Sequence, residues 1–444
     1  RAGRVKEGRC FRVITKNTYS KLQPHGVPEM LRVPLDNLLL QIVSMNVSES
    51  CRQILSQCPD PPDLIATDAA VKSLYCLQAL KDKDKDDTKD GKSRNKNDDN
   101  FTLTPLGKNL AALPCSPKIG RLLIYGSLLA CTLPCSAIAA SANSKSPFLG
   151  SSDPEIRSKV DEAKRRYCKS IGTNSDQLAI SEACREFMSL QISKAGQSEL
   201  RKHCFLNGLS YDTIIEIITL QKDLLQNLAS LGFIPSVQDG LDESSTCNRN
   251  CRKSKVLSAA ICAGFYPQLA RVLKPPKKYV ETMGSAFAKE TEAHELKLYI
   301  PEKPDDGFDM SKCTDDNVDK RGLQKVWIHP SSINSNETSF ANRFLVYTDR
   351  QVTSKAYMRD VTEVTAYPIL FFGGSLNTNF STGLITIDGW LRFSGPGRVV
   401  ALIQGLRGAL DELLELKIVD PTVDVYSNPA LIATVKLISS DGIA

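Results

Sequence analysis

The chain has 444 residues, and its 41% apolar content is enough to fill several cores. At this length about two to four domains are expected. The 56 Lys and Arg residues against 50 Asp and Glu give a net charge of +6, which permits a polyanionic partner without requiring one. No apolar run of about 18 residues occurs, so no membrane span or membrane partner is predicted.

Cysteine usage indicates the compartment. Fourteen cysteines are spread over the whole chain, many of them in apolar helical runs. This distribution is typical of reduced, buried thiols in a cytoplasmic or nuclear protein and not of a disulfide framework. Cys131 with Cys135, and Cys247 with Cys251, have tolerable zinc spacing, but neither pair has a second matching pair or a nearby histidine. No metal site is therefore predicted.

The first hundred residues divide into segments of different composition. Residues 1–28 hold basic residues and one predicted strand, Cys10–Thr15. PEMLRVPLDNLLLQIVSM and DPPDLIATDAAVKSLYCLQAL carry the apolar period of helices, and the second begins on an acidic, proline-marked segment. Residues 81–100 contain no large apolar residue and mix both charges, which predicts a solvated insertion. With the short strand and helix of FTLTPLGKNLAALP, residues 29–113 are predicted to form a winged-helix module.

Residues 114–240 are predicted to form a helical bundle. KIGRLLIYGSLLACTLPCSAIAASAN is a long apolar stretch interrupted at Pro134. DQLAISEACREFMSL and YDTIIEIITLQKDLLQNLASLGF are amphipathic, and their apolar stripes are expected to be core. A polar segment at 236–254 is expected to be a linker.

In the last part of the chain, the apolar residues recur at every second position, which is the period of a strand. After an apolar helix predicted at Leu257–Leu273, five strand-like runs follow, namely VWIHPSS, RFLVYTD, KAYMRDVTEV, PILFFGG and GLITIDGWLRFS. The helical segment VVALIQGLRGALDELLELKI comes next. These features predict an oligonucleotide-binding (OB) barrel closed by a helix over 255–421 and leave 422–444 as an uninterpreted tail. The predicted fold class is multidomain, mostly α and then β.

The chain opens with RAGR, which resembles the last four letters of motif VI of superfamily 2 helicases, Q-R-x-G-R-x-G-R. Further segments follow in the order found in the C-terminal half of a DEAH-box RNA helicase: PEMLRVPLDNLLLQI, DPPDLIATDAAVKSLYCLQAL, LTPLGKNLAALPCSPKIGRLLIYG, SKSPF, AAICAGFYPQLARV, IHPSSIN, VTSKAYMRDVTEV and PILFFGG. The resemblance extends to about Lys417–Pro421. PILFFGG and IDGWLRF are most similar to the subgroup with G-quadruplex-resolving and translation-initiation helicases.

This resemblance implies a domain order that agrees with the periodicity. Residues 1–28 would end the second RecA-like domain, and a winged helix, a ratchet bundle and an OB fold would follow. The complete protein would be an ATP-dependent RNA helicase that translocates on single-stranded RNA and unwinds RNA structure. Neither a Walker A loop nor a D-E-A/I-H sequence occurs in the chain, so ATP and Mg²⁺ are expected to require other parts of the complete protein. This polypeptide alone is not expected to hydrolyse ATP.

Two arginines carry the catalytic expectation. Arg1 and Arg4 match the motif VI arginines that reach the nucleotide phosphates, and the resemblance implies that they act as arginine fingers in the complete protein. A guanidinium suits that role because it is always charged and forks onto phosphate oxygens. In this chain by itself, the alternative is two solvated arginines at a frayed terminus.

RNA contacts are expected on the predicted barrel. In VTSKAYMRD, the hydroxyls of Thr353 and Ser354 accompany two cations, Lys355 and Arg359, and the ring of Tyr357. Strand alternation would place all of these except the serine on one face, where cations beside a stacking ring suit a single strand. Further contacts are expected at His329, Ser331, Ser332, Lys145 and Arg271.

Other interpretations of this surface stay open. The residues of VTSKAYMRD could belong to an ordinary exposed strand, and the chain could be a non-catalytic RNA-binding module. The OB fold could also dock an activator protein or a ribosomal partner. Gln177 stands where the resembled family often has histidine, so its role is left open. The remaining histidines fit no ligand pattern and are expected to be structural or solvated: His25, His203 and His294.

Overall fold

The structure is a computed structural model. It describes residues 6–82 apart from 24 and 48, 101–273 apart from 151 and 152, 279–282, 285–288, 296–301 and 323–442. Arg1, Arg4 and His294 lie outside the described residues, as does most of the predicted charged insertion.

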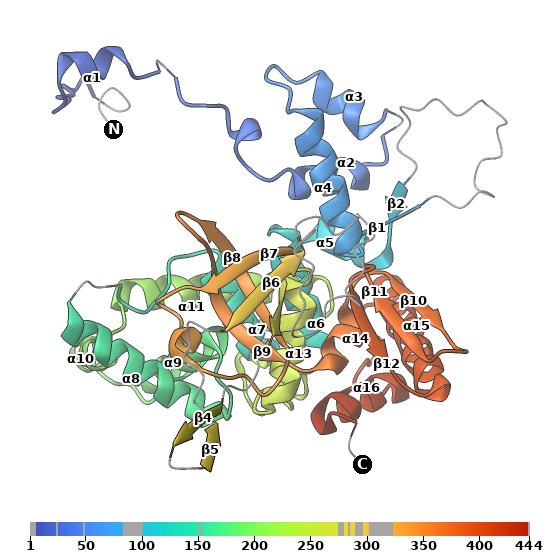
Figure 1. Ribbon diagram of the computed structural model, residues 1–444. Coiled ribbons are helices and arrows are strands. Elements are labelled where there is room, and N and C mark those ends of the chain that lie inside the picture. Colours follow the sequence, from blue (N-terminus) through green and yellow to red (C-terminus); the bar gives the residue numbers. More distant parts are fainter. Residues whose placement is uncertain are drawn as a thin grey trace.

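The N-terminal part confirms the predicted winged-helix elements. After α1 (Lys16–Ser20) and the 3₁₀ turn η1 (Glu29–Leu31), its elements are α2 (Asp36–Ser44), α3 (Cys51–Ser56), α4 (Leu64–Cys76), β1 (Leu80–Asp82), β2 (Phe101–Leu103) and α5 (Pro105–Ala112). β1 and β2 pair antiparallel and form the ribbon. Side-chain caps start the helices, since Asp63 accepts from the Ile65 N–H and Thr104 from the Gly107 N–H. Helices α2, α3 and α4 of the winged helix lie above the bundle and the barrel in Figure 1.

The strand predicted at Cys10–Thr15 does not form. Residues 7–13 have no regular structure, and Phe11 and Val13 are exposed. A strand needs a hydrogen-bonding neighbour, and none of the described segments pairs with these residues. This prediction was therefore wrong.

The helical bundle follows the predicted order up to residue 235, but the linker predicted at 236–254 was wrong, because this segment holds a short helix and a 3₁₀ turn, and its Cys247 and Asn248 are buried. Its elements are α6 (Pro117–Leu128), α7 (Thr132–Ala142), α8 (Pro154–Ile171), α9 (Asp176–Ile192), α10 (Gln197–Leu206), α11 (Tyr211–Ser230), α12 (Val237–Leu241), η3 (Thr246–Asn248) and α13 (Ser254–Phe265). The predicted break near Pro134 occurs just before it, at a left-handed Ala130 with φ 54°. Pro134 then lies in the first turn of α7, where its missing N–H breaks no helical hydrogen bond.

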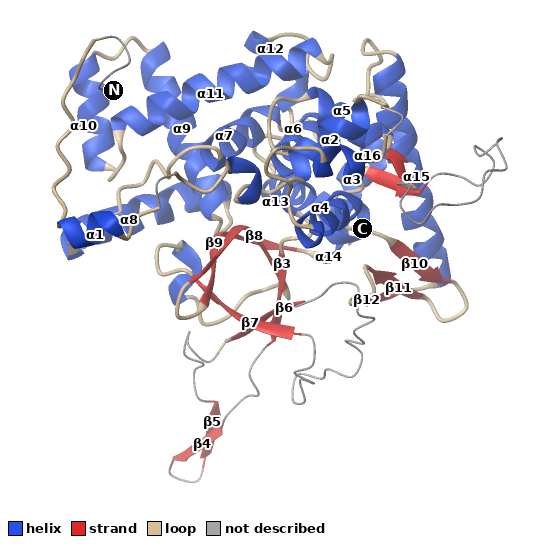
Figure 2. Cartoon of the chain, turned by 90° about the horizontal axis from the view of Figure 1, so that it is seen from above, coloured by secondary structure: helices blue, strands red, loops and turns tan. Residues whose placement is uncertain are grey.

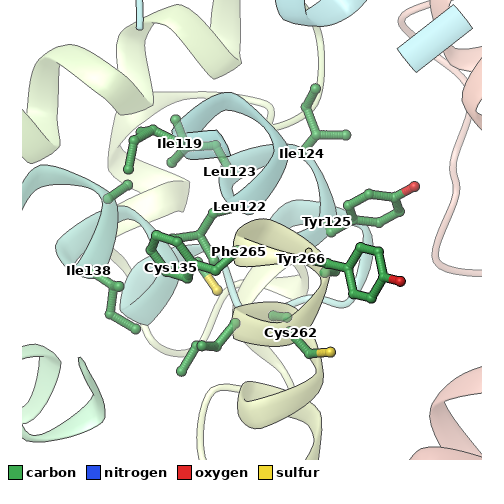
Figure 3. Packing of buried hydrophobic residues seen from close by; sticks show 14 of the residues in the cluster. Ile119, Leu122, Leu123, Ile124, Tyr125, Cys135, Ile138, Cys262, Phe265 and Tyr266 are labelled. Atoms are coloured by element: carbon green, nitrogen blue, oxygen red, sulfur yellow. The ribbon is translucent and has the colours of Figure 1, made fainter. Parts of the chain in front are cut away.

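Helices α6 and α13 pack closely at the centre of the bundle (Figure 3). Leu122 of α6 and Phe265 of α13 lie together in this core, and both are almost fully buried. A Cβ on Gly264 would come within 2.5 Å of the Leu122 Cβ, so a residue without a side chain is needed where the helices touch.

A closed five-stranded barrel confirms the predicted OB-type fold. Its strands are β3 (Leu269–Leu273), β6 (Lys297–Pro301), β7 (Leu323–Ile328), β8 (Phe344–Val352) and β9 (Ala356–Val364). They are joined in the order β3-β6-β7-β9-β8. The β7–β9 pair is parallel, and the other neighbours are antiparallel. The strands β4 (Tyr279–Thr282) and β5 (Ser285–Ala288) form a separate hairpin. The barrel has its own apolar core, which includes Val326, Leu345 and Met358.

Two predicted strand runs have other positions. PILFFGG lies in α14 (Ala366–Phe372) and not in a strand. GLITIDGWLRFS forms β11 (Leu384–Ile387) and β12 (Leu391–Ser394). β11 pairs with both β12 and β10 (Leu376–Asn379), and the three strands form a sheet outside the barrel. Figure 2 shows these strands as a group separate from the barrel. A short apolar run cannot be assigned to strand or buried helix by periodicity, which explains the first error.

The helix predicted at Leu257–Leu273 is also divided. α13 ends at Phe265, and β3 begins at Leu269, after Pro267. Proline cannot continue the helical hydrogen-bond ladder, so the apolar run changes from helix to strand there. Its second half becomes the first barrel strand.

The C-terminal part contains two helices, α15 (Gly397–Val419) and α16 (Pro429–Ser440). The predicted helix is confirmed as α15, but it packs with α5, α14 and α16 beside the β10–β12 sheet. The residues that the sequence left as a tail include α16, whose Leu431 and Ile438 are buried. This segment is therefore part of the packed molecule.

Candidate nucleic-acid interface

The segment VTSKAYMRD is a hairpin bend and not a single strand. β8 ends at Val352 and β9 begins at Ala356, and the Thr353 N–H donates to the Lys355 carbonyl across the bend at 3.0 Å. Thr353, Ser354 and Lys355 are exposed at this tip. The predicted alternation along one face therefore does not apply to the bend.

The alternation holds further along β9. Ala356 and Met358 point into the barrel and are buried, whereas Tyr357 is partly exposed and Arg359 is exposed. The parallel pairing of β7 with β9 places Trp327 next to Tyr357. The barrel thus presents aromatic side chains on the outer face of two adjacent strands.

Cations surround these rings. The Lys325 and Lys355 ammonium groups each lie 5.1 Å from the centre of the Trp327 ring. The His329 ring meets the Tyr357 ring edge-on, with centres 5.9 Å apart. We call these five residues the aromatic strip. Base stacking on rings and backbone attraction to cations are the two interactions that single-stranded nucleic acid uses.

The ring of His329 is held by its neighbour. The Ser331 N–H donates to Nδ1 at 3.1 Å, and the Ser331 hydroxyl lies 2.7 Å from the same atom. Burial lowers the pKa of His329, and the positive charges of Arg359 and Lys164 lower it further. A neutral imidazole at neutral pH follows, and it adds a ring without adding a charge.

The strip leads into a cleft of about 620 Å³ between the bundle and the barrel. The barrel side includes His329, Ser331 and Arg359, and the bundle side includes Lys145. Four of the predicted RNA contacts thus come together from separate parts of the sequence.

The charges of this cleft are mixed. Its cations are Lys145, Arg157, Lys164 and Arg359, and its carboxylates are Asp161, Asp349 and Asp360. Lys164 already donates to the Ser331 carbonyl at 2.6 Å and lies 4.0 Å from a carboxylate oxygen of Asp176. Hydroxyl and ring contacts must therefore contribute beside the phosphate charge to any grip on RNA.

Ser332, one of the predicted RNA contacts, is not on the molecular surface. Its side chain is buried, and its hydroxyl donates to Asp176 at the start of α9. Gln177, the departure from the resembled family, is also buried and donates to the Thr348 hydroxyl at 3.1 Å. Both side chains connect the bundle to the barrel, and Gln177 also lines the cleft.

Arg271 lies elsewhere. It is on β3 and lines a different cleft, between the barrel and the β10–β12 sheet. The structure therefore does not bring Arg271 together with the other predicted contacts.

Sequence reasoning missed Lys325 and Trp327. The signal was partial: Lys325 and Trp327 flank the buried Val326 at alternate positions, although Leu323, which has the same parity as these two, is buried. That pattern predicts outward-facing side chains, but only strand pairing shows that they adjoin Tyr357 and Lys355.

Three further predictions concern the cysteines, metal sites and membrane spans. None of the thirteen described cysteines forms a disulfide bond with another of them, and nine of the thirteen are buried. Among the described residues, no cluster of three or more His, Cys, Asp or Glu could hold a metal ion. Within the same part of the chain, no helix is both long and apolar enough to cross a lipid bilayer.

Four family models match successive parts of the chain. They are a helicase-associated winged-helix domain (residues 70–115), a helicase-associated ratchet-like domain (116–180), an oligonucleotide/oligosaccharide-binding fold (257–376) and a C-terminal domain in RNA helicases (383–440). The last of these covers most of the segment that the sequence left uninterpreted.

Curated relatives match almost the whole chain. The Arabidopsis thaliana DExH-box ATP-dependent RNA helicase DExH1 is 30% identical over 96% of this chain and 36% of its own length. The human ATP-dependent DNA/RNA helicase DHX36 is 31% identical, over 95% and 36% respectively. The human ATP-dependent RNA helicase DHX29 is 27% identical, over 99% and 28%. The chain therefore spans about a third of the length of these relatives.

Proposed function

We propose, from the premise that this chain belongs to the DEAH/DExH-box helicase family, that it forms a wall of the channel through which an ATP-dependent RNA helicase draws single-stranded RNA. The observation that carries this proposal is the aromatic strip, which continues into the bundle–barrel cleft. Strip and cleft together offer stacking rings, cations and hydroxyls along one path.

In this proposal the described residues grip RNA and do not handle the nucleotide. Lys355 and Arg359 attract the phosphates, Trp327 and Tyr357 stack bases, and the hydroxyls of Thr353, Ser354 and Ser331 are available to the sugar–phosphate backbone. ATP hydrolysis with Mg²⁺ in the complete protein would supply the movement. The arginine-finger role of Arg1 and Arg4 stays a prediction, since both lie outside the described residues.

The test is binding of a fluorescent oligouridylate to this chain over a salt series. The double variant Lys355→Glu/Arg359→Glu should weaken binding and flatten the dependence of log K on log salt by about 1.4, because each single-strand phosphate contact contributes about 0.7. Trp327→Ala should lower the affinity about tenfold with the slope unchanged, because stacking releases no counterions.

The matched control is Lys202→Glu/Lys222→Glu, which makes the same charge change on exposed residues of α10 and α11. If the control weakens binding as much as Lys355→Glu/Arg359→Glu, the attraction is a general effect of charge and the proposed path is wrong. Two other outcomes favour the alternatives. If Lys355→Glu/Arg359→Glu still binds RNA but no longer captures an activator or ribosomal protein, the surface is a docking site for that protein. If Lys355→Glu/Arg359→Glu weakens RNA binding by this chain but does not change unwinding by the complete protein, the chain is a non-catalytic RNA-binding module.

A further inference from the structure

A second cleft, of about 700 Å³, lies between the barrel and the C-terminal sheet. The barrel contributes Arg271 from β3 and, at the start of β8, Arg343 and Phe344. The sheet contributes Arg392 and Phe393 from β12. Two separate parts of the fold therefore build one concave surface.

This cleft is distinct from the bundle–barrel cleft, because none of the described residues lines both. Phe344 is the first residue of β8, whereas the exposed bend that carries Lys355 follows the last. The nine residues of β8 separate the two by roughly 27 Å at about 3.4 Å per residue. The cleft is thus at the opposite end of the barrel strand from the bend.

The chemistry of the lining favours an anion that carries a flat ring. Among the described residues that line the cleft, the charged side chains are three arginines, and none is a carboxylate. The rings of Phe344 and Phe393, from the two sides, lie with their centres 5.8 Å apart at an angle of 48°. Trp390 is buried behind them at 3% exposure and gives the cleft a packed base. Guanidinium groups fork onto phosphate oxygens, and phenylalanine rings stack on bases.

We propose that this cleft binds a short segment of single-stranded nucleic acid, with phosphates on the arginines and a base against Phe344 and Phe393. An acidic peptide would share the attraction to the arginines. Nucleic acid is favoured because the site is concave and of ligand-pocket volume, and because ring faces from both walls are placed beside the cations. This inference does not depend on the proposed function of the first cleft.

The experiment is photocrosslinking of a short oligouridylate containing 4-thiouridine to the full 444-residue chain, with the crosslinked peptides identified by mass spectrometry. We expect crosslinks in the peptides that contain Phe344 and Phe393. Arg343→Glu should reduce them about tenfold, because the variant replaces a phosphate-binding charge with a repelling one. Arg398→Glu, an exposed arginine on α15 that does not line the cleft, is the matched control and should leave them unchanged.

The same map separates this inference from the proposed function. Crosslinks at Phe344 and Phe393 that persist in Lys355→Glu/Arg359→Glu support the second site. Crosslinks confined to Trp327 and Tyr357 overturn the second site and leave the first. Binding of a fluorescent polyglutamate peptide that depends on Arg343, without RNA crosslinks at this cleft, also overturns it. Equal melting temperatures of wild type and Arg343→Glu establish that the variant is folded, and Arg343→Ala serves in its place if they differ.

Discussion

At the scale of single residues, Asp360 of the bundle–barrel cleft combines an unusual backbone conformation with a desolvated carboxyl group. Its backbone is left-handed, with φ 51°, a conformation that Asp and Asn tolerate better than other residues with a side chain. Desolvation raises the pKa of its carboxyl from 3.8 to about 6, and the negative charge of Asp176 adds to this. The pKa of Asp360 is higher in the folded chain than in the unfolded chain. The stability that its protonated carboxyl contributes is therefore complete below pH 3.8 and is lost as the pH rises through 6.

Asp360→Asn should therefore stabilise the chain at alkaline pH. The amide keeps the left-handed preference and removes a desolvated charge, so we expect a gain of about 1–2 kcal/mol at pH 8 and almost none near pH 4. Thermal melting at the two pH values measures it. Asp360→Ala is the control, because alanine removes the charge but adds strain of about 1 kcal/mol at positive φ. Equal melting of Asp360→Asn and wild type at pH 8 would contradict this account.

At the scale of elements, the loop that starts at the last residue of α14, Phe372, and continues through Gly374 joins three parts of the fold. Arg121 of α6 donates to the Phe372 carbonyl at 2.6 Å, and Gln78, just after α4, donates to the Gly373 carbonyl at 3.0 Å. Arg407 of α15 donates to the carbonyls of Gly373 and Gly374 at 2.8 and 2.7 Å. The winged helix, the bundle and the C-terminal helix are thus all attached to this one loop.

Arg407→Ala should release this attachment. It leaves two carbonyls without their charged donor, and we expect a loss of about 2–4 kcal/mol. Urea unfolding measures the loss, and Arg398→Ala on the same helix, whose side chain is exposed, should change the stability by less than about 0.5 kcal/mol. If the two variants unfold at the same urea concentration, the loop does not connect these elements.

At the scale of the whole molecule, Asp176 fixes the barrel against the bundle. It is the first residue of α9 and accepts from the Ser332 hydroxyl, from the Ile333 N–H at 2.9 Å and from the Val361 N–H at 3.0 Å. The Lys164 ammonium lies 4.0 Å away. One buried carboxylate therefore serves donors from two barrel segments, and it sets the geometry of the cleft beneath the aromatic strip.

Asp176→Ala should loosen the two domains. It leaves two backbone donors without their acceptor and removes the carboxylate that faces the nearly buried Lys164 ammonium, which costs about 3–5 kcal/mol. We expect limited proteolysis between bundle and barrel that wild type resists, together with weaker oligouridylate binding. The control is Asp212→Ala, an exposed acidic residue in the first turn of α11, which should cost less than about 1 kcal/mol. Unchanged proteolysis of Asp176→Ala would show that apolar packing alone holds the domains together.

Much of the fold could be predicted from the sequence, because local physics determines it. The amphipathic period of α9 and α11, the polar N-caps and the alternation at the start of β9 are properties of neighbouring residues. The order of winged helix, bundle and barrel follows from them. Two of the failures were apolar runs: α14 was predicted as a strand, and the α13–β3 run as one helix. In such runs every side chain is buried in either structure, so periodicity carries no information.

The candidate site depends more on tertiary structure. The sequence by itself determined that Lys355, Tyr357 and Arg359 are close together and that cations accompany a ring there. Only the parallel β7–β9 pairing decided that Trp327 adjoins Tyr357, and only the contact of bundle with barrel brought Lys145 to Arg359 and buried Ser332. These are contacts between residues far apart in the chain. They follow from how the elements pack, and no local pattern in the sequence encodes them.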